Sequence, residues 1–308
     1  MARNTTLSLT VPQGFDLPRV VCSYGYFLLA PNRWDVARQR LIRPLQLSDR
    51  TVHVVVDQPS RQSNRLRVAC DQPVPPQRRA PLKRQLSRML RLDEDLAHWF
   101  QQNPTARAEG FGRIFRSPTL FEDIVKTITG CNVAWGNTMQ MNRLLCERIG
   151  GGRFPEVAEL VAVSPKTLQA ETKVGYRAER IVRLAQRVAS GDLELEWFGQ
   201  PGRTSEEAFT ALRRIHGIGP YAAANVCQHL GFYDQLPIDS ETQRHFCRHF
   251  NVERPRNPSA LHHRIERHYN QFAPHQFLAY WYELWRDYER KLGTAWRWDV
   301  STGARVTR

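Results

Sequence analysis

The chain has 308 residues, of which 41% are hydrophobic and 24% are charged, so it is long enough to bury one large core or two smaller ones. These values are typical of an ordinary globular protein and exclude a fibrous or largely disordered chain. The charge is unusual, because 44 Lys and Arg against 30 Asp and Glu give a net charge of +14. This excess predicts a polyanionic partner, with nucleic acid first and an anionic membrane second.

The first residues, MARNTTLSLTVPQG, lack the apolar run of a secretory signal. No later segment approaches the run of about 18 apolar residues that a membrane span needs. We therefore expect a soluble, intracellular protein. The six cysteines are scattered and form no CxxC pair, which argues against a zinc site or an iron–sulfur cluster. We expect reduced and mostly buried thiols.

Four short runs rich in β-branched and aromatic residues predict an antiparallel sheet near the N-terminus. A segment rich in proline and basic residues follows at 71–85 and indicates a boundary. The sequence therefore predicts an α+β protein, with an antiparallel β domain at 1–75 and a mainly helical region at 76–308. The four predicted strands lie within 5–12, 19–31, 50–58 and 65–72.

From Leu86 onward, apolar residues recur at helical spacing. Ser117 and Pro118 have the residue types of a helix N-cap and first position. Thr204 and Glu207 have the spacing of a capping box. The predicted helices lie within 86–103, 117–152, 164–173, 176–191, 204–217 and 275–292.

The stretch LRRIHGIGPYAAANVCQHLG, residues 212–231, interrupts a helical pattern with two glycines and a proline. Gly217 suits the left-handed residue that ends a helix, and Pro220 suits the first position of the next helix. Such a turn exposes backbone N–H groups beside a helix N-terminus, and this arrangement can bind a phosphate, directly or through a metal ion. An ordinary corner between two helices is the alternative.

Asp239 follows Pro237 and stands just before another predicted helix, in which Ser240 and Gln243 have capping-box spacing. A helix dipole keeps a carboxylate at this position ionised. Asp239 could therefore be a fixed anion that faces a substrate developing positive charge. The alternative is that Asp239 is only a helix cap.

The two features together resemble the helix–hairpin–helix (HhH-GPD) DNA glycosylases, in which L-x-x-I-x-G-I-G-P-x-x-A is followed about twenty residues later by P-x-D at a helix start. The segments SPTLFEDIVKTITGCNVAWGNTMQMNRLLCERIG, KVGYRAERI and LSRMLRLDEDLAHWF are also similar to segments of that family. The resemblance covers roughly 83–290 and, more loosely, 1–75. It is nearest to the alkyladenine and 8-oxoguanine branches.

The resemblance implies an enzyme of base excision repair that flips a damaged base out of DNA and cleaves its N-glycosidic bond. Asp239 then matches the catalytic aspartate, and Gly217, Ile218 and Gly219 match the DNA-binding hairpin. Tyr221, also in the hairpin, takes the place of the lysine of the lyase-competent branch. The expected activity is therefore that of a monofunctional glycosylase that acts on a damaged, alkylated purine. A bifunctional 8-oxoguanine-type glycosylase/AP lyase and a non-catalytic DNA-binding protein stay open as alternatives.

Four further residues are candidates for the wedge or the base pocket. Asn132 matches the position from which the 8-oxoguanine branch inserts an asparagine into the stack, although a local backbone contact is the alternative. Trp135 could line the pocket or belong to the core. Trp281 and Trp285 lie with Tyr288 on one helical stripe, which is core or the aromatic wall of the pocket. Glu283 and Asp287 lie off that stripe, and we expect them to be solvated.

We expect no cofactor for catalysis, and only a monovalent cation at the hairpin when DNA is bound. His245 and His249 are spaced i, i+4, but no third ligand is spaced to complete a metal site, so none is expected. The expected partner is double-stranded DNA that contains a damaged base, with no membrane, and the expected state is a monomer. The protein would lie with DNA in the cytoplasm and nucleoid, or in a nucleus.

Overall fold

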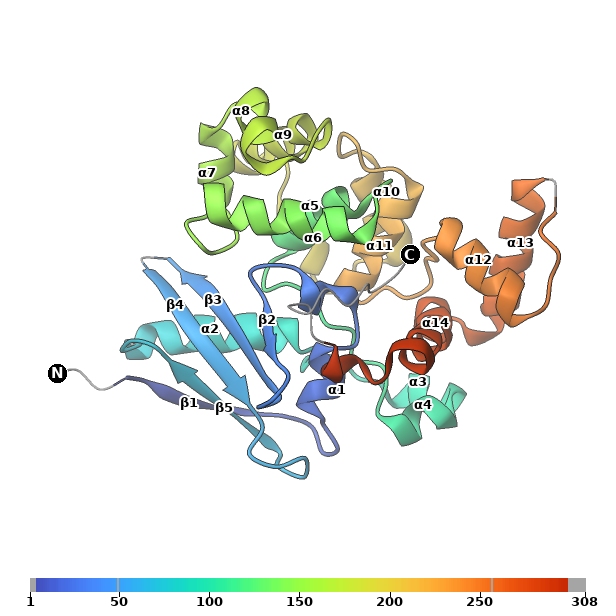
Figure 1. Cartoon of the computed structure of the whole chain (residues 1–308), viewed down its shortest axis with the longest axis horizontal. Helices are drawn as coiled ribbons and strands as arrows, with labels where there is room; N and C mark the ends of the chain where they lie inside the picture. Colours follow the sequence, from blue (N-terminus) through green and yellow to red (C-terminus); the bar gives the residue numbers. More distant parts are fainter. Residues whose placement is uncertain (1–3, 49, 256, 299–308) are drawn as a thin grey trace.

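The protein is an α+β protein in which a five-stranded antiparallel sheet is followed by a large helical part, as the sequence predicts (Figure 1). The computed structural model describes residues 4–48, 50–255 and 257–298. The strand order in the sheet is β1-β5-β4-β3-β2. The strands are β1 (Thr6–Thr10), β2 (Arg33–Asp35), β3 (Arg40–Leu47), β4 (Arg50–Asp57) and β5 (Arg65–Cys70).

Three of the four predicted strands form, and one does not. The segment 19–31 instead contains the end of helix α1 (Leu17–Val21) and a 3₁₀ turn at Gly25–Leu28. Its apolar residues are buried almost without alternation, so its hydrophobic run reflects full burial and not a strand. Strands β2 and β3 are not predicted from the sequence, and β3 contains Pro44 within its ladder.

Helix α2 (Pro76–Met89) occupies most of the segment that the sequence predicts as a boundary at 71–85. Pro76 lies in its first turn, where proline is tolerated. Leu82, Leu86 and Met89 form its buried stripe. The helix contacts β3 and lies along the sheet in Figure 1. The proline-rich composition therefore marks the start of a packed helix. The division into domains at 1–75 and 76–308 stays a prediction.

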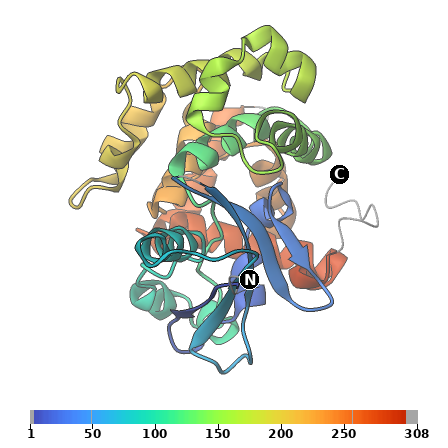
Figure 2. The same cartoon turned by 90° about the vertical axis from the view of Figure 1, so that its left-hand side faces the viewer.

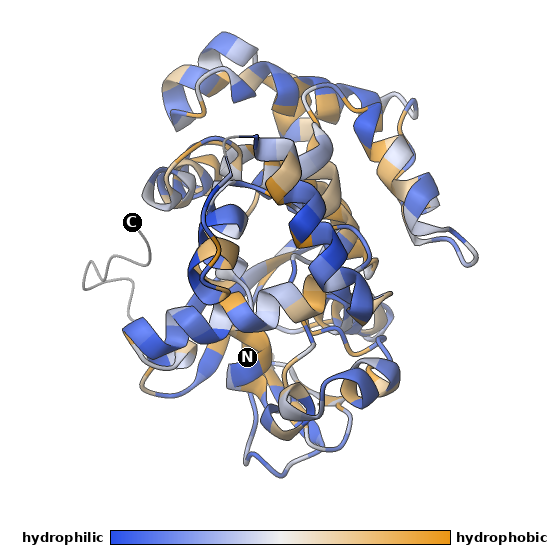
Figure 3. Cartoon of the chain, turned by 90° about the vertical axis from the view of Figure 1, so that its right-hand side faces the viewer, coloured by the Kyte–Doolittle hydropathy of each residue, from blue (hydrophilic) through white to orange (hydrophobic). Residues whose placement is uncertain are grey.

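One hydrophobic core is formed by residues between Leu120 and Cys227, and another is shared by the sheet and the chain from Tyr233 to Trp298. Hydrophobic residues gather toward the middle of the molecule (Figure 3). In Figure 2 the sheet faces the viewer, with this helical part behind and above it. The remaining α-helices are α3 (Ala97–Gln102), α4 (Pro104–Glu109), α5 (Leu120–Gly130), α6 (Trp135–Leu144), α7 (Val157–Ala162), α8 (Pro165–Thr172), α9 (Arg177–Ala189), α10 (Ser205–Arg213), α11 (Pro220–Leu230), α12 (Ser240–His249), α13 (Pro258–Tyr269) and α14 (Gln276–Leu292).

The helix starts follow the expected capping chemistry with two corrections. Thr204 and Glu207 form the predicted capping box of α10. Helix α5 is capped by Thr119, whose hydroxyl accepts a bond from the backbone N–H of Glu122, and not by Ser117. The cap of α12 is Asp239 with Thr242, and not the pair Ser240 and Gln243. In both cases the residue directly before the first helical turn has the extended backbone that a cap requires.

A cluster of buried charges joins the sheet to the helical part. Arg43 on β3 pairs with Glu122 on α5, and Lys126, one turn later, pairs with the same carboxylate at 2.6 Å. The side chains of all three are at most 3% exposed. Burial lowers the pKa of Lys126, whereas Arg43 and Lys126 together overcome the effect of burial and lower the pKa of Glu122.

The six cysteines are free thiols, and five of them are buried. Within the described residues, no helix is both long and apolar enough to span a bilayer.

Candidate active site

A pocket of about 370 Å³ lies where the segment after α1 meets α5, α11, α12 and α14. It contains Asp239, and one end is bounded by Tyr221 from the start of α11. A larger cavity of about 500 Å³ lies between β3 and the starts of α5 and α7, but it includes neither Asp239 nor the hairpin. The pocket that contains Asp239 is therefore the candidate site. Its other lining residues include Tyr24, Gly25, Tyr26, Lys126, Thr127, Trp135, Asn225, Glu241, Arg244, Phe277, Tyr280, Trp281, Trp285 and Tyr288.

The Asp239 carboxylate is fixed by the start of α12. Its Oδ1 atom accepts hydrogen bonds from the backbone N–H groups of Glu241 at 2.9 Å and Thr242 at 2.8 Å. Thr242 Oγ1 lies 3.0 Å from the same oxygen. Within the described part of the chain, Oδ2 accepts no hydrogen bond. One carboxylate oxygen therefore caps the helix, and the other is left for a substrate or a water molecule.

Neutral phenol groups surround this carboxylate. Thr242 Oγ1 lies 3.0 Å from Tyr280 Oη, which connects the start of α12 to α14. Burial, and then the negative charge of Asp239, raise the pKa of Tyr221 and Tyr280 well above the ordinary value. Burial raises the pKa of Tyr24 as well, with smaller contributions from Asp123 and Asp239. These hydroxyl groups stay protonated and can donate hydrogen bonds at neutral pH.

The hairpin has the predicted geometry. Gly217 has a φ of 83°, in the left-handed region, and Gly219 is the N-cap residue of α11 with Pro220 in the first turn. Ile218 between the glycines is 4% exposed and anchors the turn in the core. The side chain of Arg180 on α9 covers Gly217 so closely that a Cβ atom there would lie 2.3 Å from Arg180 Cδ. The left-handed backbone therefore favours glycine at 217, whereas the flexible end of the Arg180 side chain could move away from a Cβ atom there.

Tyr221 lines the pocket one residue after Pro220, where an amine would face the same space. The only lysine among the lining residues is Lys126. Its ammonium group is buried and paired with Glu122, so it is not positioned as a free nucleophile.

Trp281 and Trp285 belong both to the core and to the pocket wall. Their rings stack with centroids 5.4 Å apart, and Trp281 also stacks on Phe277 at 5.8 Å with an interplanar angle of 10°. Trp281 Nε1 donates to the carbonyl oxygen of Ser23 at 2.8 Å, which fixes the ring. The two interpretations of this stripe are therefore compatible, because one face packs while another lines the pocket.

Trp135 lines the pocket from the first turn of α6 and packs against Gly25 on the opposite wall. A Cβ atom at position 25 would lie 2.9 Å from Trp135 Cζ2. Trp135 Nε1 is buried and has no hydrogen-bond partner in the described part of the chain. A buried indole N–H without a partner is costly, and a ligand in the pocket could accept its hydrogen bond once a rotation of the ring exposes it.

Asn132 lies outside the pocket lining, on the exposed turn between α5 and α6, with a φ of 52°. Arg177 at the start of α9 holds this turn, because its guanidinium donates to the carbonyl oxygens of Cys131 and Asn132. The Asn132 side chain is free to enter a bound duplex, so the wedge role stays a prediction.

Tyr176, directly before α9, was not identified as a site residue from the sequence. It is 54% exposed, and the guanidinium groups of Arg177 and Arg180 lie 4.6 and 4.8 Å from its ring centroid. Arg180 Nη1 also lies 3.4 Å from the carbonyl oxygen of Gly217. The sequence signal that could have identified Tyr176 is its place directly before a helix, after Gly175 and followed by Arg177 and Arg180.

Asp287 is 7% exposed and Glu283 has a side chain that is 22% exposed, so the expectation that both are solvated is wrong for Asp287. The buried face of α14 is wider than the aromatic stripe that the sequence predicts. One part of this face lines the pocket, and another part packs against α12. Asp287 lies beside His245, and this contact supplies the acidic neighbour that the sequence spacing did not reveal.

No protein-family model and no curated protein sequence matches the chain. Solved structures do match. They include MBOgg1 in complex with a low-affinity DNA ligand, with a TM-score of 0.68 and 20% identity over 95% of this chain and 98% of that chain. The 3-methyladenine DNA-glycosylase from Archaeoglobus fulgidus matches with a TM-score of 0.68 and 17% identity over 91% and 99% of the two chains.

The 8-oxoguanine glycosylase/lyase of Clostridium acetobutylicum, in its apo form, matches with a TM-score of 0.67 and 16% identity over 92% and 98% of the two chains. All three likenesses extend over the sheet and the helical part together. The chain therefore has the fold of DNA glycosylases that act on alkylated and on oxidised bases.

Proposed function

We propose that the protein is a monofunctional DNA glycosylase that hydrolyses the N-glycosidic bond of a damaged, alkylated purine. The observation that carries this proposal is the Asp239 carboxylate, which is fixed through Oδ1 and presents Oδ2 in an aromatic pocket next to the glycine hairpin. The fold shared with known glycosylases supports the reaction class.

The pocket walls favour an electron-poor base. Trp281, Trp285 and Trp135 present aromatic rings, whose faces attract cations. An alkylated purine with a positive ring gains more from these faces than a normal base does. After a rotation of the ring that exposes it, the unpaired Trp135 Nε1 would donate to an acceptor atom on the base edge, which selects among the bases that fit.

In the proposed reaction, the bond between C1′ and the base nitrogen breaks, and the bonding electrons leave with the base. A cationic alkylated base departs as a neutral molecule and needs no protonation. Asp239 stabilises the positive charge that develops on the sugar. A water molecule then forms the bond to C1′ and transfers its proton to Oδ2 of Asp239, which acts as general base.

The surface around the pocket supports DNA binding. The backbone N–H groups at the start of α11 can meet a phosphate, and the turn from Ile215 to Gly219 offers carbonyl oxygens but no carboxylate. This donor set fits a weakly held monovalent cation between turn and phosphate. The exposed ring of Tyr176 can stack on a base while the partly exposed Arg180 meets a phosphate. Arg177 is buried and holds the turn between α5 and α6.

A bifunctional glycosylase/lyase is the second candidate, favoured by the match to structures of that class. Such an enzyme needs an amine that attacks C1′. The pocket offers a tyrosine at the hairpin position and only the ion-paired Lys126 elsewhere in its lining. Borohydride treatment during the reaction would trap a covalent adduct with DNA if a lyase step occurs, and we expect no adduct.

The main test is base release from duplexes that carry one alkylated purine, hypoxanthine, 8-oxoguanine or uracil. Wild type, Asp239→Asn and the control Asp95→Asn are compared, each with and without alkali. Asp95 also accepts a backbone N–H bond at a helix start but lies outside the pocket. We expect release of an alkylated purine by wild type and by the control only, with strand breaks only after alkali. Equal release by Asp239→Asn would reject the proposed mechanism.

A further inference from the structure

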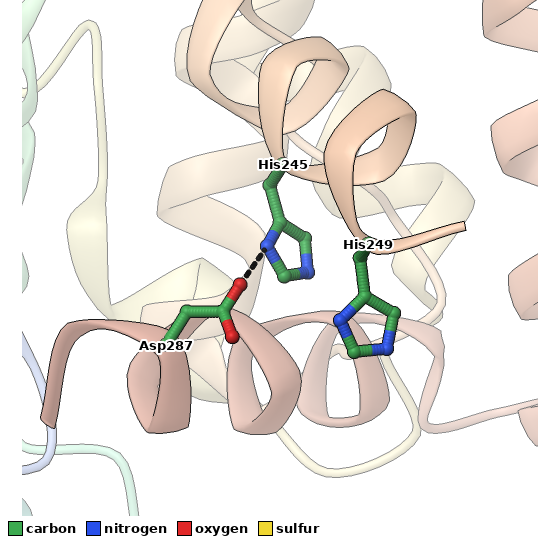
Figure 4. Close-up of side chains that lie close together, drawn as sticks. All are labelled: His245, His249 and Asp287. Carbon is green, nitrogen blue, oxygen red and sulfur yellow. Dashed lines mark ion pairs between the residues drawn. The ribbon is translucent and has the colours of Figure 1, made fainter. Parts of the chain in front are cut away.

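Three potential metal ligands converge on the side of α12 that faces α14. His245 and His249 lie one turn apart on α12, and Asp287 reaches them from α14 (Figure 4). One ligand atom from each residue lies within 4.8 Å of the other two. His245 Nδ1 is 2.9 Å from Asp287 Oδ2, and the two histidine ring centroids are 5.2 Å apart.

The cluster contains a buried group whose polar atoms lack satisfactory partners. His245 is fully buried, and neither ring nitrogen makes a hydrogen bond of acceptable geometry within the described part of the chain, although Asp287 is close. Buried imidazole nitrogens normally have a partner. A group at the centre of the cluster would supply one.

We propose that His245, His249 and Asp287 form a binding site for a divalent transition metal ion of the Zn²⁺ type. Two imidazoles and one carboxylate are a ligand set that such ions prefer, and three protein ligands leave a position for water. This inference does not depend on the proposed glycosylase activity.

The geometry fits this class of ion after a small movement of one side chain. Metal–nitrogen and metal–oxygen bonds of about 2.0–2.2 Å place two ligand atoms no more than about 4.4 Å apart. His249 is exposed and can rotate inward to close the remaining gap. Burial of His245 and Asp287 keeps the other two ligands in place.

The surroundings resemble the outer shell of a metal site. With His245 Nδ1 as the ligand, Nε2 faces Glu283 Oε2 at 3.8 Å, and Tyr269 Oη donates to that same carboxylate oxygen at 2.6 Å. A carboxylate behind a ligating histidine orients the ring and increases its basicity. Arg290 pairs with Oδ1 of Asp287 at 2.5 Å, which leaves Oδ2 for the metal.

Occupancy of the site would connect the two helices that build the candidate active site. Asp239 caps the start of α12, and Trp285 lies on α14 two residues before Asp287. A metal ion held by both helices would fix the carboxylate relative to the aromatic wall. The site lies outside the pocket lining, so its role is positioning and not catalysis.

The experiment measures binding of Zn²⁺ and of Co²⁺ to chelator-treated full-length protein, by dialysis with metal analysis and by the visible spectrum of bound Co²⁺. The test variants are His249→Gln and Asp287→Asn. His263→Gln removes another exposed histidine, and Cys247→Ser removes the thiol between the two histidines. His249→Gln changes an exposed side chain, so it keeps the test valid if Asp287→Asn fails to fold.

We expect one ion per chain and a Zn²⁺-dependent increase in Tm for wild type, His263→Gln and Cys247→Ser. His249→Gln should bind about tenfold more weakly or worse, since a ligand is lost. No binding by wild type would overturn the proposal and leave His245 and Asp287 as a close pair that binds no metal ion. Binding that is equally strong in His249→Gln would overturn it as well, by placing the ion elsewhere.

Discussion

Arg43 Nη2 on β3 lies 2.5 Å from Glu122 Oε2 on α5, in a contact that is almost completely buried. The same carboxylate also neutralises Lys126. Replacement of Glu122 by Gln would leave two buried cations without a counterion. We expect the free energy of unfolding to fall by about 3–5 kcal/mol, as measured by urea denaturation.

The matched control for this prediction is Glu147→Gln. Glu147 pairs with Arg143 at 2.7 Å, but both side chains are about half exposed. Its loss should change the free energy of unfolding by about 1 kcal/mol or less. Equal effects of the two substitutions would show that the buried cluster does not join the sheet to the helical part in the way described.

Asp239 should have separable structural and chemical roles. In Asp239→Asn the remaining carbonyl oxygen can still cap α12, so stability should be nearly unchanged while the rate of base release falls about 10²–10³-fold. Asp239→Ala should lose both, with about 0.5–2 kcal/mol of stability lost from the missing cap. Thermal unfolding and single-turnover kinetics of the two variants check this. A loss of stability in Asp239→Asn as large as in Asp239→Ala would contradict the separation of the two roles.

Trp135→Phe tests the unpaired indole N–H. The ring stays but the donor is removed, so binding of a duplex with the flipped base should weaken by about 0.5–1.5 kcal/mol, while binding of undamaged DNA should not change. Competition binding with both duplexes measures the difference. The control is Trp281→Phe, whose indole N–H already donates to Ser23 and should affect folding stability instead.

His229 gives the protein a defined dependence of stability on pH. It is fully buried on α11 and stacks on Tyr26 at 4.6 Å. Burial lowers its pKa to about 3, and the arginines Arg91, Arg88 and Arg116 add to this against the opposing effect of Asp123. Between pH 3 and 6.5 the unfolded chain therefore binds a proton that the folded chain does not.

Stability should thus fall as the pH decreases through this window, by up to about 1.4 kcal/mol per pH unit from this residue. His229→Phe should lose less stability between pH 7 and pH 5 than wild type does, as measured by urea denaturation at both values. The exposed His263→Phe should behave as wild type. The same slope in wild type and His229→Phe would contradict the prediction.

Local signals in the sequence were enough to predict the structure where a single residue determines the backbone conformation. Gly217, Pro220 and the Thr204 capping box were assigned correctly, because a left-handed residue, a helix start and a cap each demand particular residue types. The aspartate at 239 was found for the same reason. The predicted α+β fold class is also confirmed, since short apolar runs form the sheet and apolar residues at helical spacing form the helices.

Tertiary contacts decided what the sequence did not reveal. The apolar residues of the run 19–31 are buried on all sides, which removes the periodicity that separates helix from strand. The sequence therefore predicts a strand where a short helix and a 3₁₀ turn form. The sequence predicts an exposed Asp287, because nothing local indicates that α12 covers that face of α14. Tyr176 stands out only once the hairpin and α9 are seen side by side.

The two carboxylate oxygens of Asp239 have different roles, because only Oδ1 caps α12. This difference has a consequence for how the site could change in evolution. Folding requires only an oxygen that accepts the N–H bonds of Glu241 and Thr242, a role that Asn and Ser also perform. In the proposed mechanism, base release requires the second oxygen and its negative charge. If the proposed mechanism holds, a single substitution to Asn abolishes activity without a loss of folding stability. A descendant with Asn at this position would keep the fold and the pocket but not the chemistry.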